Sequence, residues 1–485
     1  MGLLMAILPV LVTLGLLAVP RMPAAIPPLI GTITAAALAL WYFDAPASDL
    51  VTAWNDTFWT LIKVLAIIGG GVLLSGVMDR TGAQRTLANW LSAGGPTIPA
   101  ALLMAHGVVP FLETVTGFGV SVLIGLPLLL SVGFTPYRAA LLTLLGLMIG
   151  PWGSMGPGTL IAADAAGASL TDMGLVSGWM NIIPFVVSGI AVSVIAGNGY
   201  TTTTLSRSQK IGWAGIATAS GLILWGFTML ANLLLGTPVA GAVSTMIMSV
   251  IWLLYIRRGN LTPGPGRSLV PYLILMFGTI AGQIIYRTVD LGALGEVLAS
   301  PALWSTTGAL ASLTFLPISA EDQRALPKAT LVMWWGVAIP TALYVLLGVM
   351  IAGGGLADVI AGSLADLGAV YLFLMPFVAG LSGYITASGT GANAMFGATQ
   401  VAAAQGLGVS PLWAMGLQNS AAGWAIIAGP ARIELAYRMA YAYQRDDTPG
   451  PLVSRGALVN VLLPIVLLSL ALWGIVAVIF LPLTG

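Results

Sequence analysis

Glu113 is the residue in this chain with the clearest potential for chemistry, because an acidic side chain here follows an apolar run, Val109-Pro110-Phe111-Leu112. A buried carboxyl group can take up and release a proton, and an ionisable group in an apolar span indicates function. His106 lies seven residues earlier, two turns along a helix, so both would share one face. We therefore predict Glu113 and His106 as proton-coupling residues. The alternatives are a Glu113 that only accepts backbone N–H bonds and a His106 that only hydrogen-bonds a neighbour.

Two glycine-rich motifs, Thr116-Gly117-Phe118-Gly119 and Ser388-Gly389-Thr390-Gly391, interrupt apolar stretches in the two halves of the chain. Helix N-termini at such breaks carry partial positive charge and bind carboxylates. Hydroxyl and amide side chains nearby add further hydrogen-bonding groups. The alternative is that small residues only permit close helix packing. The predicted substrate-binding residues of the motifs are Thr114, Thr116, Gly117, Phe118, Gly119, Thr386, Ser388, Gly389, Thr390, Gly391 and Asn393.

Further polar groups follow each motif, where a helix is expected to be interrupted. The segments are Gly150 to Pro157 in the first half, and Gln418-Asn419-Ser420 with Gly429-Pro430 in the second. Gln418, Asn419 and Ser420 could hydrogen-bond a substrate or satisfy freed carbonyl groups, and we include them among the predicted substrate-binding residues. Arg432 could attract a carboxylate, but a cationic anchor at the cytoplasmic end of a span is the simpler interpretation.

The amino-acid composition indicates a membrane protein rather than a soluble one. Of 485 residues, 58% are hydrophobic and 7% are charged, against about 25% charged in soluble domains. These values predict an all-α polytopic membrane protein embedded in the lipid bilayer. The net charge of +1 suggests no nucleic-acid partner. With no cysteine and one histidine, disulfides, thiolate sites and multi-histidine metal centres are excluded, and no cofactor or metal is expected. Residues 1–19 are interpreted as a retained span rather than a signal peptide.

Apolar stretches of spanning length predict about 12 transmembrane helices. They lie at about 3–19, 24–43, 57–78, 138–155, 175–197, 211–234, 238–256, 269–286, 301–318, 329–352, 410–430 and 456–483. Two more apolar stretches, about 97–134 and 369–406, are too long for one span, and their halves of roughly 15–17 residues are short for two. Each is predicted to be a re-entrant hairpin whose tip is the glycine-rich motif.

The distribution of charge predicts the orientation in the membrane. With the N-terminus outside, every Lys and Arg except Arg287 and Lys63 falls on the cytoplasmic side, and both termini are outside. The two hairpins then enter from opposite sides, which predicts two inverted-topology repeats. Gly76-Val77-Met78, which recurs as Gly348-Val349-Met350, supports the duplication. The predicted segments are 1–56 (N-terminal helices), 57–197 (repeat 1), 198–328 (connecting helices), 329–440 (repeat 2) and 441–485 (C-terminal helix).

The segment from Phe111 to Gly119 resembles the F-L-E-G-A-A-G-F-G signature of the bacterial lactate permease family. Further matching positions are Pro127 to Leu129, Gly133-Phe134, Gly153 to Gly156, Thr386, Ser388, Thr390, Asn393 to Gly397, Gln400 and Asn419-Ser420. The resemblance implies a proton-coupled carrier of lactate, glycolate and related monocarboxylates, an elevator-type motion and a homodimer. Gly389 stands where the family has an aspartate, and Ala425 to Gly429 replaces a lysine-containing segment. The chain is therefore similar to the family as a divergent member.

Together these observations predict a secondary active transporter of a small organic anion in the bacterial inner membrane, driven by proton symport. A Na⁺-coupled carrier of another small carboxylate is the alternative, because Thr, Ser and Asn oxygens at the tips could coordinate Na⁺. An anion channel or a membrane-embedded enzyme has little support, since no nucleophile–base pair or metal cluster occurs in the apolar stretches. The spacing of residues does not identify the anion.

Overall fold

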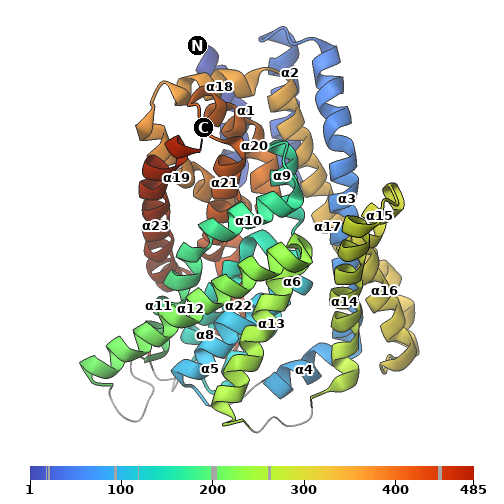
Figure 1. Cartoon of the computed structure of the whole chain (residues 1–485), viewed down its shortest axis with the longest axis vertical. Coiled ribbons are helices and arrows are strands. Elements are labelled where there is room, and N and C mark those ends of the chain that lie inside the picture. Colours follow the sequence, from blue (N-terminus) through green and yellow to red (C-terminus); the bar gives the residue numbers. More distant parts are fainter. Residues whose placement is uncertain are drawn as a thin grey trace.

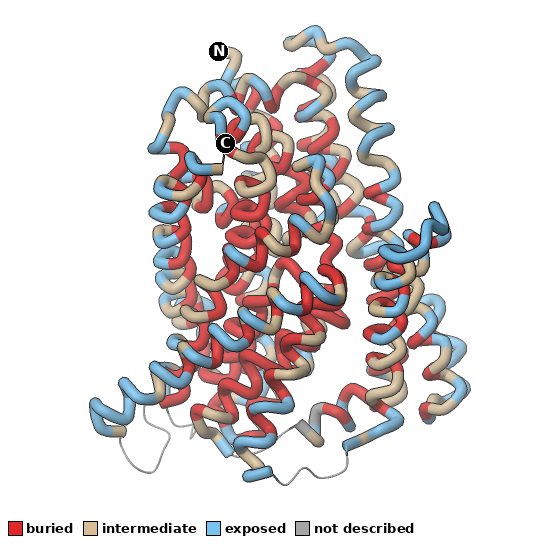
Figure 2. The backbone as a smooth tube through the Cα atoms, in the orientation of Figure 1, coloured by how far each residue is buried: buried red, intermediate tan, exposed pale blue. Residues whose placement is uncertain are grey.

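The computed structural model describes residues 1–485 except 18, 20–21, 92–94, 118, 198–204, 260–263, 446–449 and 485. All regular elements in the described part are helices, packed side by side as an elongated bundle (Figure 1). Large apolar side chains such as Ile33, Leu233, Leu468 and Ile479 are exposed on the outside of this bundle. Burial is concentrated at its centre (Figure 2). An apolar exterior around a packed centre is the pattern of a protein whose solvent is lipid.

Each predicted span falls on helical segments, although those at 138–155, 175–197 and 410–430 are divided between successive helices. The number of membrane crossings remains a prediction. Among the described residues, eight helices are long and apolar enough to cross a membrane, or ten if two bent pairs each count as one span. These eight include the first arms of both predicted hairpins, Ile98–Val115 and Ala369–Thr386. Each arm has 18 residues, so both are longer than the 15–17 residues predicted from the sequence.

Both halves of the chain carry helices in the same order. The first series is α3 (Ala47–Arg80), α4 (Ala83–Leu91), the arm α5–η1–α6 (Ile98–Leu102, Leu103–Val108, Val109–Val115), α7 (Val120–Val132), α8 (Pro136–Leu145), η2 (Gly146–Met155) and α9 (Pro157–Ala165). The second series is α17 (Ala320–Gly353), α18 (Leu356–Ala365), α19 (Ala369–Thr386), α20 (Gly389–Gly406), α21 (Pro411–Ala425), η3 (Ile426–Ala428) and α22 (Pro430–Ala442). The long helices α3 and α17 both have 34 residues. This order supports the predicted duplication, whereas the inverted topology and the segment boundaries remain predictions.

The remaining helices complete the bundle. They are α1 (Gly2–Leu17), α2 (Ile26–Trp41), α10 (Leu170–Met180), α11 (Ile182–Gly197), α12 (Arg207–Leu235), α13 (Thr237–Ile256), α14 (Gly266–Thr288), α15 (Ala293–Ala299), α16 (Pro301–Phe315), α23 (Arg455–Phe480) and η4 (Leu481–Leu483). Helix α3 packs against α17 and α16, and α17 also contacts α2 and α20. Both termini lie toward the upper end of the molecule (Figure 1).

Basic residues lie at several helix ends at one end of the bundle, which also holds Glu321 and Asp322 at the start of α17. The lower end in Figure 1 holds the end of α3 and the starts of α12 and α14, with Arg80, Arg207 and Arg267 at those helix ends. The upper end holds the start of α3 and the short helix α18, with Asp49 and Asp358 in their first turns. The positions of these basic residues follow the predicted pattern of cytoplasmic basic loops. Which end faces the cytoplasm remains a prediction.

Backbone conformation explains where each hairpin turns. In the first tip, Gly117 and Gly119 have φ angles of 58° and 88°, a region that glycine enters without strain. In the second tip, Ala387 has a φ of 51° and Ser388 caps α20, with its Oγ accepting from the Gly391 N–H at 3.1 Å. Both tips therefore end one helix and begin another within five residues.

The helices that follow the hairpins are broken, as predicted. Residues Gly153 and Ser154 leave helical geometry inside η2, and α9 is bent by 71° from the segment before it. In the second series Gly429 is extended before Pro430 opens α22. The two broken segments are in contact, because a Cβ atom on Gly150 in η2 would lie 2.7 Å from Gly423 Cα in α21. Gln418, Asn419 and Ser420 do not interrupt the helix but lie within α21.

Candidate functional site

A cavity of about 400 Å³ lies where the two hairpin tips meet the two helix breaks. Helix α17 closes one side through Thr341 and Tyr344. The lining residues from the tips and breaks include Glu113, Gly117, Gly153, Ser154, Pro157, Gly158, Thr386, Ser388, Gly389, Thr390, Asn419, Gly423, Ala431 and Arg432. The fold thus brings together segments that are far apart in the sequence, as the prediction of meeting tips required.

Three helices begin at the wall of this cavity. They are α9, α20 and α22, whose second residues, Gly158, Thr390 and Ala431, all line it. The first N–H groups of an α-helix have no acceptor within the helix and carry partial positive charge. In the described part of the chain, the N–H groups of Gly389 and Thr390 have no hydrogen-bond acceptor. This arrangement favours a negatively charged ligand.

Glu113 and Arg432 are the charged residues on the cavity wall. Glu113 Oε1 lies 3.9 Å from Arg432 Nη2, and the side chains are 12% and 13% exposed. This distance is too long for a hydrogen bond. The other carboxylate oxygen of Glu113 accepts a hydrogen bond from Ser121 Oγ on α7. Arg432 Nε is buried and has no hydrogen-bond partner among the described residues.

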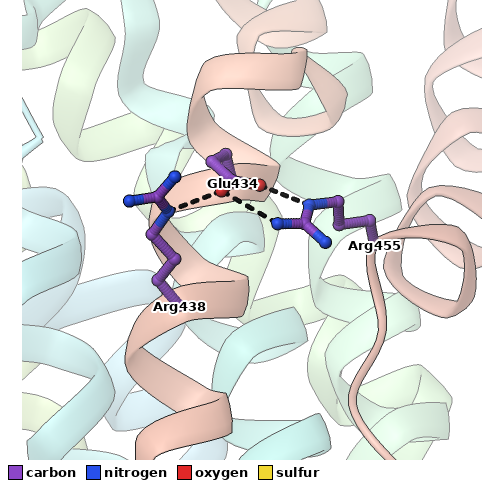
Figure 3. A network of polar contacts seen from close by, with 3 residues as sticks. All are labelled: Glu434, Arg438 and Arg455. Atoms are coloured by element: carbon purple, nitrogen blue, oxygen red, sulfur yellow. Dashed lines mark hydrogen bonds and ion pairs between the residues drawn. The ribbon is translucent and has the colours of Figure 1, made fainter.

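Helix α22 is held in place by a second ion cluster, on its exposed side. Glu434 receives Arg438 Nε at 2.5 Å and Arg455 Nη2 at 3.0 Å, and Arg455 Nε donates to its other oxygen (Figure 3). Hydrogen bonds from Arg455 and then Arg438 lower the pKa of Glu434 to about 2. Because Arg455 opens α23, this exposed cluster links α22 to the start of α23, and its three residues do not line the cavity.

His106 lies away from the cavity. It is fully buried in the π-helix η1, with Nδ1 2.8 Å from Ser220 Oγ and Nε2 3.2 Å from Ser188 Oγ. A π-helical turn changes the register of side chains, so a spacing of seven residues does not put His106 and Glu113 on one face. No described contact joins the two residues, and the predicted role of His106 in proton coupling stays a prediction.

The first tip contributes Gly117 to the cavity wall, whereas Gly119 lies beside Arg432. Gly117 lines the cavity, and a Cβ atom on it would lie 2.5 Å from Ser154 Cβ. Thr114 and Thr116 are buried, donate their hydroxyls to the carbonyls of Phe111 and Leu112, and do not line the cavity. Phe118 lies outside the described residues.

The second tip lines the cavity more extensively, through Thr386, Ser388, Gly389 and Thr390. Thr386 Oγ1 donates to the carbonyls of Ser382 and Ser388, which holds the turn. Gly391 packs against the ring of Tyr344 on α17, where a Cβ atom would lie 3.0 Å from the ring.

The polar residues of α21 mainly satisfy one another. Asn419 lines the cavity, accepts from Asn393 Nδ2 at 2.8 Å and donates to Thr159 and Ser177 at 2.9 Å. Asn393 also donates to the Gly158 carbonyl at 3.0 Å. The partners of the other two lie away from the cavity: Gln418 bonds Gln400 and Ser382, and Ser420 bonds Asn181. These bonds go mainly to other side chains rather than to freed carbonyl groups, and substrate contact by the three residues stays a prediction.

Arg432 is the residue that sequence reasoning placed outside the site. The sequence analysis placed Arg432 at the cytoplasmic end of a predicted span. In the structure, the break at Gly429 turns α22 so that its first turn faces the cavity. The Gly429-Pro430 pair directly before it was the available signal. Thr341 and Tyr344 carried no signal, because they lie in an ordinary apolar helix.

Comparisons with known proteins identify a matching family, similar sequences and a similar solved structure. The family described as L-lactate permease matches residues 2–260 and 283–441. The L-lactate permease of Streptococcus iniae is 24% identical over 457 residues, covering 84% of this chain and 92% of that protein. The L-lactate permease of Escherichia coli K12 is 25% identical over 447 residues, covering 78% and 79%. The Alcanivorax borkumensis YdaH transporter shares the fold with a TM-score of 0.50 at 14% identity, over 94% of this chain and 98% of that one.

Proposed function

The chain belongs to the L-lactate permease family, and from this membership we propose that it is a secondary active transporter carrying a lactate-like monocarboxylate by proton symport. It is a multi-pass membrane protein, and its matched relatives are permeases rather than enzymes. The observation that carries the proposal is the cavity at the meeting point of both tips and both helix breaks, bordered by three helix N-termini and Arg432.

A small carboxylate suits this cavity for electrostatic reasons. The N-termini of α9, α20 and α22 and the Arg432 guanidinium all favour negative charge, and Glu113 is the acidic residue among the lining residues. The hydroxyls of Ser388 and Thr390, which line the cavity, would bond polar groups on the rest of the substrate, whereas the Thr386 hydroxyl holds the turn. Gly389 leaves its side of the cavity open, since a Cβ atom there would meet nothing within 4 Å. Lactate, glycolate and similar acids form the substrate class.

Glu113 is the proposed proton carrier. A monocarboxylate that crosses alone moves one negative charge against the membrane potential, which costs about 2.3 kcal/mol per 100 mV. A proton carried on Glu113 makes the loaded site neutral relative to the empty one. Proton symport therefore removes the electrical penalty for uptake and lets a pH gradient drive it.

Na⁺ is the second candidate coupling ion, favoured by two unpaired amide oxygens. Asn393 Nδ2 donates to the Gly158 carbonyl and to Asn419, and Asn181 Nδ2 donates to a carbonyl one turn earlier, so the orientation of both amides is fixed. The Oδ1 atoms of Asn393 and Asn181 are left buried without a described partner. Neutral oxygens beside a broken helix are the ligands that Na⁺ takes in inverted-repeat carriers.

Motion and assembly complete the proposal. The cavity lies between the tips and breaks on one side and α17 on the other, which supports an elevator-type motion of the hairpin-bearing helices along α17 and α3. We further propose a homodimer in the bacterial inner membrane, with both termini outside.

Uptake of radiolabelled L-lactate into proteoliposomes tests the proposal. An inward proton gradient should drive saturable accumulation in the absence of Na⁺, and C2–C4 monocarboxylates should compete. Accumulation that follows a Na⁺ gradient at equal pH would select the second candidate. Flux that neither saturates nor shows counterflow would contradict a carrier of either kind.

A further inference from the structure

Arg432, on the cavity wall, is an incompletely satisfied cation among the described residues. A guanidinium group has five N–H donors and no acceptor. Nε is buried without a partner in the described part of the chain, and the ion pair of Nη2 with Glu113 is 3.9 Å long. A buried donor without a partner costs free energy, and a carboxylate placed between the tips would remove that cost.

The contact of Glu113 with Arg432 is long enough for a substrate carboxylate to replace it. Its carboxylate is shared between Ser121 Oγ on α7 and the distant Arg432 guanidinium. A substrate carboxylate that forms short hydrogen bonds to Arg432 would outcompete this long contact. The Glu113 carboxylate would then share the single Arg432 charge with a second carboxylate at close range, which favours its protonated form.

We propose that Arg432 binds the substrate carboxylate and that Glu113 pairs with Arg432 when no substrate is bound. Anion binding then releases Glu113 to take up one proton. This inference rests on the proposed function, because it assigns the coupling step of that same site. The exchange balances: one carboxylate and one proton enter the site, the proton resides on a Glu113 oxygen, and the net charge of the site is unchanged. No covalent bond forms or breaks apart from the O–H bond of Glu113.

Few titratable or charged groups surround Glu113, so its pairing with Arg432 can control whether it is protonated. Helix α6 packs against η1, η2, α7 and α13, whose titratable groups are His106 and Tyr255. His106 is engaged by two serines, and Tyr255 is exposed at the far end of α13. Tyr272 on α14 reaches α6 only through ring contact with Phe111. In the described part of the chain, the charge that faces Glu113 is that of Arg432.

Proton uptake on binding is the direct test. Purified protein in a weakly buffered solution near pH 7.5 is titrated with L-lactate while a pH indicator and calorimetry follow protons and affinity. The wild type should take up about one proton per lactate bound, and its affinity should rise as pH falls. Glu113→Gln should bind lactate with no proton uptake and no pH dependence. Arg432→Gln should lose about a hundredfold in affinity.

Two matched controls lie on the same helix. Arg438→Gln and Glu434→Gln remove one charge of each sign from the exposed cluster of α22, outside the cavity, and should leave affinity and proton uptake unchanged. A neutral substrate analogue, lactamide, should neither bind Arg432 strongly nor cause proton uptake. Glu113→Gln protein that still takes up a proton with each lactate overturns the inference, as does Arg432→Gln protein with wild-type affinity.

A readout without substrate separates this inference from the proposed function. Infrared difference spectra at pH 7.5 should show a protonated carboxyl band in empty Arg432→Gln protein that is missing from the wild type and from the Glu113→Gln/Arg432→Gln double variant. Absence of that band overturns the pairing. Lactate binding without proton uptake in the wild type defeats the inference alone, whereas wild-type protein that binds no monocarboxylate defeats the proposed substrate as well.

Discussion

The Arg432 guanidinium occupies space that a side chain at position 119 would need, and Gly119 has none. A Cβ atom at position 119 would lie 2.6 Å from Arg432 Nη1 and 3.2 Å from Leu435 Cδ2, and the residue has a φ of 88°. The first hairpin tip and the N-terminal turn of α22 are therefore fitted to each other at a glycine. This contact links the position of the cationic group to the conformation of the tip.

Gly119→Ala should move Arg432 away from the cavity. We expect lactate uptake to fall at least about tenfold, through both the clash and a left-handed strain of roughly 1–2 kcal/mol. Gly82→Ala is the matched control, because Gly82 has a similar φ of 68° and a Cβ atom there would meet nothing within 4 Å. Uptake assays and thermal unfolding of both variants are the measurement. Equal effects of the two substitutions would show that backbone strain, rather than Arg432, explains the loss.

Asn419→Ala should destabilise the folded carrier, since the amide joins α21 to α20, α9 and α10 through three hydrogen bonds. Removing it leaves partners such as Thr159 and Ser177 with unmet bonds, at a cost of about 1–3 kcal/mol. Thermal unfolding in detergent should show a lower midpoint. Asn55→Ala, an amide exposed on α3, should change the midpoint little. An unchanged midpoint for Asn419→Ala would mean that water replaces the amide without loss.

The ion cluster of Glu434 predicts a pH dependence of stability. Its pKa in the folded chain is about 2, below the ordinary value of 4.5, so the folded state favours the ionised form. The stabilisation is complete above the ordinary pKa and is lost as pH falls toward 2. The difference in unfolding midpoint between wild type and Glu434→Gln should be constant above about pH 6 and shrink below about pH 4.5. The effect should be small and weaken in high salt, because the carboxylate is partly exposed. A difference that grows on acidification would refute this assignment.

Cysteine labelling should establish the orientation of the bundle, because the chain contains no cysteine. Ala47 and Ser208 are exposed near opposite ends, at the starts of α3 and α12. In intact cells or spheroplasts, Ala47→Cys should react with a membrane-impermeant maleimide from outside. Ser208→Cys should react only after the membrane is opened. The reverse pattern would place the basic end outside and contradict the predicted topology.

The sequence predicted the helices well because lipid imposes a strong rule on composition. Spans must be apolar and of a certain length, so the predicted spans fall on helices and the two glycine-rich interruptions fall on turns. The meeting of the tips also followed from the duplication. The lengths of the hairpin arms were harder to predict, since both first arms have 18 residues. The apolar pattern also does not reveal the π-helical segment inside the arm from Ile98 to Val115.

The wall of the cavity was harder to predict because a polar group in an apolar helix has two possible partners. Thr114 and Thr116 bond carbonyls of their own helix, and Gln418 bonds Gln400, although each looks from the sequence as available as Ser388. The sequence did not identify Arg432 as a cavity residue for a different reason. A cation near the end of a span has an ordinary explanation, and only the direction of α22 after its break shows that it faces inward.

Three helix N-termini and Arg432 surround one cavity, and such a site recognises negative charge before it recognises shape. Chloride and bicarbonate are abundant in cytoplasm and medium, and both are small enough to enter. They should therefore occupy the site weakly whenever the organic acid is scarce, and the apparent affinity for the acid should fall as chloride rises. The working rate of the carrier would then follow the ratio of organic to inorganic anions in its surroundings rather than the concentration of the acid alone.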